Sequence, residues 1–296
     1  MAERHHRGLP WKTWAARLFM TVVLPSLGFG GTADAGELAE LREDVRAESD
    51  SSGSWFSGKP GGATYDEQDD FNPLGELFGE FIGPVAVGVV LSPILAPRYF
   101  TGDDGVVDAY FPGYPYRNAS DGYLMLDEWK SRPRRWAARL RSEYCADFGD
   151  LSRTGGHLLL STTPRWGLDT EMNFFEERLG DRGRDDLWMG DFNVVYRFAQ
   201  SERSEWRAGI GFNWLDDPID TDFGFNFTYG FDFFPVKPFV LSTELDWGTL
   251  GSAEAFHFRT TVGVLIRRAE AYIGYEYRDV DRFHFDGLIA GVRLWF

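Results

Sequence analysis

The sequence is short of cysteine, of basic residues and of long apolar runs. Its 296 residues include one cysteine, Cys145, so a disulfide within the chain and sites built from several thiolates are excluded. Acidic residues outnumber basic ones by 46 to 30, which argues against binding to nucleic acid, because phosphates need a basic surface. An apolar stretch of about 20 residues, which a helical membrane protein needs several times over, is also missing.

Aromatic residues, in contrast, are abundant. They make up 17% of the chain, with 26 Phe, 12 Tyr and 11 Trp, although the mean hydropathy is −0.31. Such a content excludes a wholly disordered chain. The polar average therefore has to be explained by the way in which apolar and polar residues are sorted along the chain.

The first 35 residues have the features of an export signal. Basic residues from Arg4 to Arg17 precede the apolar stretch 18–27, and the sequence Ala33-Asp34-Ala35 then offers small residues for cleavage. This pattern predicts a signal peptide over 1–35 that is cleaved after Ala35. The alternative, a membrane anchor, is disfavoured because the apolar stretch contains Pro25 and is short for a span.

Residues 36–133 form an acidic region with 18 acidic and 7 basic residues. Its first part has few large apolar residues and is expected to be disordered in isolation. Within it, 74–97 is apolar: a stripe at helical spacing is followed by the stretch 82–95, which Pro84 and Pro93 interrupt. We expect this apolar segment to dock against the rest of the protein, as a plug or cap at the inner mouth of a barrel.

Residues 134–296 alternate between apolar and polar to the last position. From 223 to 233 every odd residue is Phe or Tyr, whereas every even residue from 222 to 232 is Asp, Gly, Asn or Thr. Because successive side chains of a strand point to opposite faces, one face is aromatic and the other polar. The pattern predicts ten strands at 135–147, 156–163, 166–175, 187–199, 205–215, 222–234, 238–247, 255–267, 270–279 and 283–296.

The fold class expected for this part is all-β, an antiparallel transmembrane up-and-down β-barrel. A soluble sandwich also alternates, but charged residues of both signs lie within the polar faces, which suits an enclosed lumen. Large aromatics near strand ends are typical of the girdles that border the apolar band. The girdle candidates are Trp206, Trp214, Trp247 and Tyr277. Eight or twelve strands remain alternatives; the latter would add a strand at 123–129.

The last strand resembles the end of bacterial outer-membrane β-barrel proteins. It closes on Phe296, preceded at alternate positions by Leu294, Val292, Ala290 and Leu288, which is similar to the signature that the insertion machinery of this class reads. The resemblance implies that outer-membrane lipid and this machinery are partners. It also implies location in the outer membrane of a Gram-negative-type bacterium, a periplasmic region 36–133, and short inner turns opposite longer outer loops.

Side chains fill most of the lumen of a barrel this small. The inward face carries charges of both signs, which can pair; they are Arg139, Arg141, Glu143, Asp169, Glu171, Asp191, Arg197, Arg207, Asp232, Glu244, Arg259, Arg267, Glu276 and Arg293. This favours a structural or surface-interaction role over a wide pore. A narrow small-solute channel is the first alternative, and neither the solute nor the oligomeric state follows from the sequence.

One cluster offers a second alternative, an outer-membrane hydrolase. Histidine beside a carboxylate can perform general acid–base chemistry, and such residues are expected on the inward face near the outer mouth: Glu244, Asp246, His257, His284 and Asp286. A satisfied network in the lumen explains them more simply, so no catalytic residue is assigned and no enzyme is favoured. No cofactor or metal is expected, because the acidic stretch 216–222 lacks a calcium-loop signature and is interpreted as a solvated loop.

Overall fold

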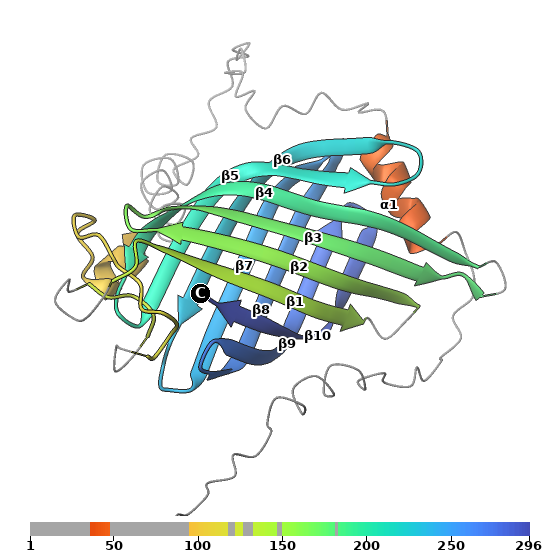
Figure 1. Ribbon diagram of the computed structural model, residues 1–296. Coiled ribbons are helices and arrows are strands. Elements are labelled where there is room, and N and C mark those ends of the chain that lie inside the picture. The colour runs from red at the N-terminus through yellow and green to blue at the C-terminus, as the bar shows by residue number, and fades with distance from the viewer. Residues whose placement is uncertain (1–35, 48–94, 118–121, 127–132, 147–149, 181–182) are drawn as a thin grey trace, which may run out of the picture. The chain divides into compact units, whose positions relative to one another are not determined.

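The computed structural model describes residues 36–47, 95–117, 122–126, 133–146, 150–180 and 183–296 (Figure 1). Ten antiparallel strands form a closed barrel in this part of the chain. They are β1 (Trp136–Ala146), β2 (Leu151–Thr162), β3 (Trp166–Arg178), β4 (Arg184–Gln200), β5 (Ser204–Asp216), β6 (Thr221–Phe233), β7 (Phe239–Leu250), β8 (Ala253–Ile266), β9 (Ala269–Val280) and β10 (Phe283–Trp295). Helix α1 (Glu37–Arg46) and a helical stretch at residues 95–101 precede them.

The barrel closes where the first strand meets the last. β1 pairs with β10 from Arg139 opposite Trp295 to Ala146 opposite Leu288, and every other strand pairs with its two neighbours in sequence. The predicted all-β, ten-stranded, up-and-down barrel is confirmed, and the alternatives of eight and twelve strands are wrong. Residues 122–126, expected to start an extra strand, instead contribute Met125 to an isolated bridge with Tyr110 outside the barrel sheet.

Burial follows the alternation that the sequence predicts. In β1, Arg139, Arg141 and Glu143 are buried in the lumen, whereas Leu140 and Tyr144 are exposed on the outside. Lumen glycines leave room for long polar neighbours: a Cβ on Gly230 would lie 2.4 Å from the guanidinium carbon of Arg207.

Arg267 is an exception among the predicted inward charges. It lies beyond the end of β8 in the two-residue turn to β9, has a positive φ of 61° and is exposed. The alternation of apolar and polar residues in the sequence continues beyond Ile266, the last paired residue of β8. Arg267 was therefore predicted to face inward, although a turn residue belongs to neither face.

The connections at the two ends of the barrel are similarly short, contrary to the expected longer outer loops. We call the end where β1 starts and β10 finishes the terminal end, and the opposite end the α1 end. At the α1 end, 281–282 spans two residues and 179–183 spans five; at the terminal end, 267–268 spans two and 234–238 spans five. The strands extend into the expected loops, and β2 starts at Leu151 rather than at 156.

Helix α1 closes the α1 end of the barrel (orange in Figure 1). Its side chains Leu38, Leu41 and Val45 are buried at spacings of three and four residues, which places them on one face of a helix. They belong to an apolar cluster with lumen-facing residues of the strands, which include Cys145, Phe175, Leu215 and Phe285. We call this cluster the α1 seal.

A second apolar cluster, the terminal seal, lies at the other end. Phe111, Tyr116 and Tyr123, from the chain before β1, pack with lumen-facing Phe234 and Trp295. The Tyr123 ring lies 5.0 Å from the Trp295 ring, and the Tyr116 hydroxyl donates to the carbonyl oxygen of Phe239 at 2.7 Å. Residues of 109–117 and 122–126 contribute to the seal, whereas the predicted plug 82–95 lies outside the described residues except for Leu95.

The region 36–133 was predicted to be periplasmic. Its described parts lie at both ends of the barrel, with 36–47 at the α1 seal and residues of 109–117 and 122–126 at the terminal seal. A membrane that surrounds the barrel would separate the two. The physical reason is the apolar face of α1, which is buried only where strands supply a matching cluster. In the described part of the chain no helix is long and apolar enough to cross a membrane.

Candidate functional site

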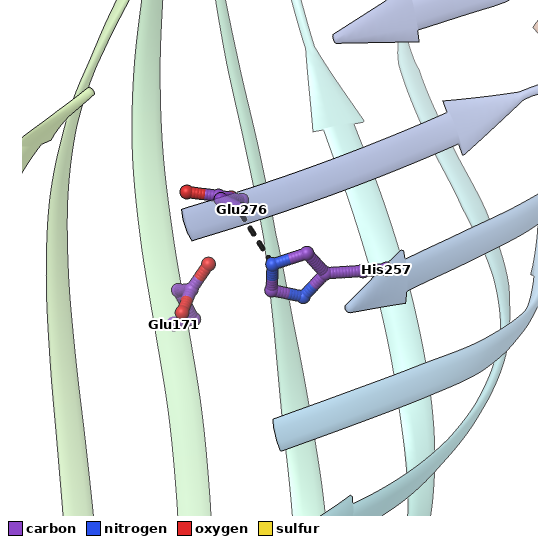
Figure 2. Close-up of side chains that lie close together, drawn as sticks. All are labelled: Glu171, His257 and Glu276. Carbon is purple, nitrogen blue, oxygen red and sulfur yellow. Dashed lines mark ion pairs between the residues drawn. The ribbon is translucent and has the colours of Figure 1, made fainter. Parts of the chain in front are cut away.

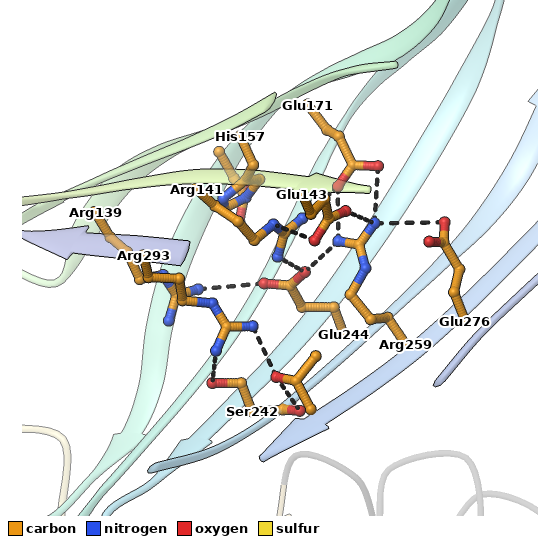
Figure 3. Close-up of polar contacts among 12 residues, drawn as sticks. Arg139, Arg141, Glu143, His157, Glu171, Ser242, Glu244, Arg259, Glu276 and Arg293 are labelled. Carbon is orange, nitrogen blue, oxygen red and sulfur yellow. Dashed lines mark hydrogen bonds and ion pairs between the residues drawn. The ribbon is translucent and has the colours of Figure 1, made fainter. Parts of the chain in front are cut away.

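Between the two seals lies a network of buried ion pairs, and Glu244 of β7 is near its centre (Figure 3). Its carboxylate contacts Arg139 and Arg141 of β1, at 3.2 Å for the first, and Arg259 of β8 at 2.9 Å. Arg207 of β5 adds a contact at 3.1 Å. The residue is buried, so these guanidinium groups supply the countercharge that water would otherwise provide.

Besides Glu244, Arg259 contacts three further carboxylates of this network. Its guanidinium lies within 2.9 Å of Glu143, 2.7 Å of Glu171 and 3.4 Å of Glu276. Arg153 of β2 pairs with Glu143 and Glu276 from the other side. Acids and bases thus share partners instead of forming separate pairs, which fixes the strands of opposite walls relative to each other.

His257 is the best-placed histidine of the predicted cluster (Figure 2). Its Nδ1 lies 2.8 Å from Asp246 and its Nε2 lies 3.0 Å from Glu276. Glu244 is on the same inward face, one strand away, but is occupied by arginines. The structure therefore brings together three of the five predicted site residues, all in the wall of a packed lumen.

His284 and Asp286 are not part of this cluster, and their predicted inward placement is wrong. Both are exposed on the outer face, where His284 pairs with Asp279 and Asp286 accepts a hydrogen bond from the Tyr275 hydroxyl at 2.9 Å. They have the parity of Leu288, which faces outward. The inward positions next to them belong to Phe283 and Phe285 of the α1 seal.

Glu171, His257 and Glu276 have ligand atoms within 4.8 Å of one another, which is a spacing suited to a metal ion. Arginines already neutralise both carboxylates: Arg259 contacts both, and Arg278 contacts each at 3.1 and 3.4 Å. A divalent cation would add positive charge to a place that is already balanced. The geometry therefore fits an internal ion-pair network better than a metal site.

Several members of the polar lumen were not predicted from the sequence, among them Arg153, His157 and Glu270. Arg153 and His157 both lie in β2, whose alternation is weak, and His157 pairs with Asp169 across β2 and β3 at 2.5 Å. Glu270 starts β9 and is fully buried, where it accepts hydrogen bonds from Arg293 and from the indole of Trp295, both at 2.9 Å. Because Leu158 was assigned to the apolar outer face, the alternation would have placed its neighbour His157 on the inward face.

Polar contacts fix α1 at the rim of the barrel. The carboxylate of Asp217 forms ion pairs with Arg42 at 2.7 Å and with Arg46 at 3.1 Å. Arg282 of the rim forms an ion pair with Asp44 of α1. Burial alone would raise the pKa of Asp217, but hydrogen bonds from Arg46 and from backbone N–H groups lower it well below its usual range. The stretch 216–222 was interpreted as a solvated loop; in the structure its Asp217 side chain is covered and serves as a receptor for α1.

At the terminal end, a similar ion pair connects the barrel to the chain that precedes it. Arg165, in the turn after β2, donates two hydrogen bonds to Asp103 at 2.7 and 2.8 Å. Burial would raise the pKa of Asp103, but Arg165 and the backbone N–H groups of Gly105 and Gln200 lower it. A hollow of about 360 Å³ beside this pair is lined by acidic and small residues, among them Asp104 and Glu202.

The outer face carries the predicted girdle and insertion residues. Trp206 packs on Phe231 at 3.8 Å between ring centroids, Trp247 is 55% exposed, and Tyr277 contacts Phe256 at 6.2 Å. Trp214 also points outward, opposite Phe223. Leu288, Ala290, Val292 and Leu294 share the outer face of β10, and the backbone of Phe296 exchanges hydrogen bonds with Ala138 of β1.

Comparisons with known proteins give little guidance. No family model matches the chain, and no curated protein matches it. Two similar solved structures are the β domain of the Bordetella autotransporter BrkA and the KdgM porin in complex with disordered oligogalacturonate. The first is 12% identical, covers 54% of this chain and 97% of its own, and has a TM-score of 0.29. The second is 11% identical, covers 54% and 99%, and has a TM-score of 0.24. At TM-scores this low neither alignment supports an argument, and the fold rests on the strand pairing alone.

Proposed function

We propose that the protein is exported and integrated into a bacterial outer membrane as a barrel without an open pore, with a structural or surface-interaction role. The observation that carries the proposal is the reversal of the usual burial pattern. Apolar side chains such as Ile210 and Leu288 are more than 60% exposed on the outside, while arginines and glutamates are buried within. A water-soluble protein would not expose such a surface around its whole circumference.

The aromatic side chains support the same placement. On the outer face, Trp136 and Trp166 lie near the terminal end, whereas Trp188 and Trp247 lie toward the α1 end. Apolar residues occupy the positions between them. Two aromatic belts that border an apolar band are the arrangement by which barrels match the two interfaces of a membrane.

The lumen favours a closed barrel over the channel alternative. Paired arginines and carboxylates fill its middle, and an apolar seal covers each end. The hydrolase alternative loses support for a related reason. Of its five residues two face outward, and Glu244 is held by arginines.

Replacing Ile210 by arginine tests the membrane placement. Ile210 lies in the middle of β5 and is 61% exposed on the outer face, so the variant should lose about 2–4 kcal/mol of folding free energy in lipid. The same replacement at Ile219, which is 79% exposed in the connection after β5, is the matched control and should change little. Folding into lipid vesicles, followed by urea titration, gives both values.

Equal stability of the Ile210→Arg and Ile219→Arg variants would contradict the proposal, because an arginine on a water-exposed strand face is harmless. Extraction of the protein from bacterial membranes by alkaline carbonate would contradict it as well. An integral barrel stays with the membrane fraction under this treatment.

A further inference from the structure

Glu177 is a buried acid without a cationic partner among the described residues. It lies near the end of β3, at the α1 end, and is 7% exposed. Its two carboxylate oxygens accept hydrogen bonds from the backbone N–H groups of Glu37 at 2.9 Å and Leu38 at 3.0 Å. In the described part of the chain no Lys, Arg or His lies within ion-pair distance of it, whereas the acids of the central network face several arginines. A buried charge that lacks a countercharge is unfavourable.

Gly36 lies directly against this carboxylate. A Cβ at this position would be 2.7 Å from the Oε2 atom of Glu177 and 2.7 Å from the Cδ2 atom of Leu179. A larger residue at this position would displace the Glu177 carboxylate or the Leu179 side chain. Gly36 is also the residue that follows the predicted cleavage site after Ala35.

We propose that cleavage after Ala35 creates an α-ammonium group on Gly36 that Glu177 binds as its missing countercharge. Hydrolysis breaks the Ala35–Gly36 peptide bond; the hydroxyl of water goes to the Ala35 carbonyl carbon and its proton to the Gly36 nitrogen. The new amine takes a further proton from solvent at neutral pH. In the precursor the same nitrogen is an uncharged amide, so the pair exists only in the processed chain. The inference rests on the export proposed above.

The position of this pair at the N-terminal end of α1 matters for its electrostatics. The N-terminal end of a helix carries partial positive charge, which disfavours an ammonium group placed there and favours an anion. Glu177 offsets both charges at once, because it accepts the first N–H groups of α1 and faces the residue that bears the amine. Processing of the leader would therefore fix α1 in its seal.

The experiment uses the full chain, expressed with its own leader and purified from the membrane fraction. Intact mass and N-terminal sequencing should give Gly36 as the first residue. The folded protein is then treated with formaldehyde and cyanoborohydride, and methylation of each amine is followed by peptide mass spectrometry, with Lys237 as the internal reference. Pairing with Glu177 should make the Gly36 amine react about tenfold more slowly than in the Glu177→Gln variant, which corresponds to a pKa raised by about one unit.

Glu176→Gln is the matched control. Glu176 is the neighbouring acid of β3 on the outer face, where it pairs with the exposed Arg184 at 3.1 Å, so its loss should leave the Gly36 amine as protected as in the unmodified protein. Unheated gel mobility establishes that each variant retains a folded barrel. If Glu177→Gln does not fold, the Gly36→Ala variant, in which the added Cβ displaces the Glu177 carboxylate from the amine, should show the fast reaction instead.

Two outcomes would overturn the inference while leaving the proposed function intact. One is a membrane-integrated protein whose first residue is not Gly36. The other is a Gly36 amine that reacts at the same rate in the unmodified, Glu177→Gln and Glu176→Gln proteins. Absence of the chain from the membrane fraction would instead contradict the proposed function.

Discussion

At the scale of single residues, the lumen is a set of charges that depend on one another. Arg259 of β8 contacts four carboxylates, one from each of the strands β1, β3, β7 and β9. It is 1% exposed. Bulk water therefore has little access to this side chain and cannot replace a lost partner. The effect of a substitution here is therefore expected to be large and to depend on which partner is removed.

Replacing Arg259 by methionine should destabilise the barrel by about 3–5 kcal/mol, because it leaves buried carboxylates without their shared cation. Arg184→Met is the control: Arg184 is 65% exposed and, among the described residues, pairs with Glu176 alone, and such surface pairs contribute about 0–1 kcal/mol. Urea unfolding in detergent or lipid measures the free energy of both variants. Similar losses at the two positions would show that the lumen pairs are not the stabilising network described above.

Residue parity explains which of the lumen groups the sequence could reveal. In β7 to β9 the alternation is regular, so the inward positions of Glu244, His257 and Glu276 followed directly. His284 and Asp286 were misplaced although their parity matches that of Leu288, which was taken as outward. Arg153 was missed because the strand was expected to begin at 156, and a residue assigned to a loop has no face.

At the scale of elements, α1 acts as a seal that is assembled from two distant parts of the chain. Its apolar face contributes Leu38 and Leu41, and the strands contribute residues that include Cys145. All three are fully buried. Because Cys145 is the single cysteine of the chain, its accessibility to thiol reagents reports whether the seal is closed.

The variant Leu41→Asp should open the α1 seal, because a charge cannot remain in an apolar cluster without a partner. We expect the thiol of Cys145 to react at least about tenfold faster with a maleimide, as a loss of about 1.4 kcal/mol of seal stability implies. Ala39→Asp places the same charge on the exposed face of α1 and should leave the rate unchanged. Equal rates in the two variants would contradict the role of α1 as a seal.

The strands could be predicted from sequence to a much greater extent than the helix and the seals. Local alternation of apolar and polar residues predicts each strand of a barrel, and strands that are neighbours in sequence pair with each other. The position of α1 depends on contacts between residues separated by more than 130 positions, such as Glu37 with Glu177, which no local pattern encodes. The same holds for the terminal seal, to which residues of 109–117 and 122–126 contribute; the predicted plug 82–95 lies outside the described residues except for Leu95.

At the scale of the whole molecule, the barrel has three layers along its axis. An apolar seal with α1 lies at one end, the ion-pair network occupies the middle, and an apolar seal with Tyr116 and Tyr123 lies at the other end. Each layer fills the lumen with side chains. The exposed apolar belt outside and the filled lumen inside are the two observations behind our proposal of a membrane barrel that does not conduct.

Electrical recording across a planar lipid bilayer tests this central claim most directly. The purified full chain, with its insertion verified by resistance of the barrel to protease, should show no steady conductance above that of the lipid alone at neutral pH. The Leu41→Asp variant should behave likewise, because the ion-pair network and the terminal seal remain. Stable, reproducible conductance steps from the unmodified protein would contradict the account.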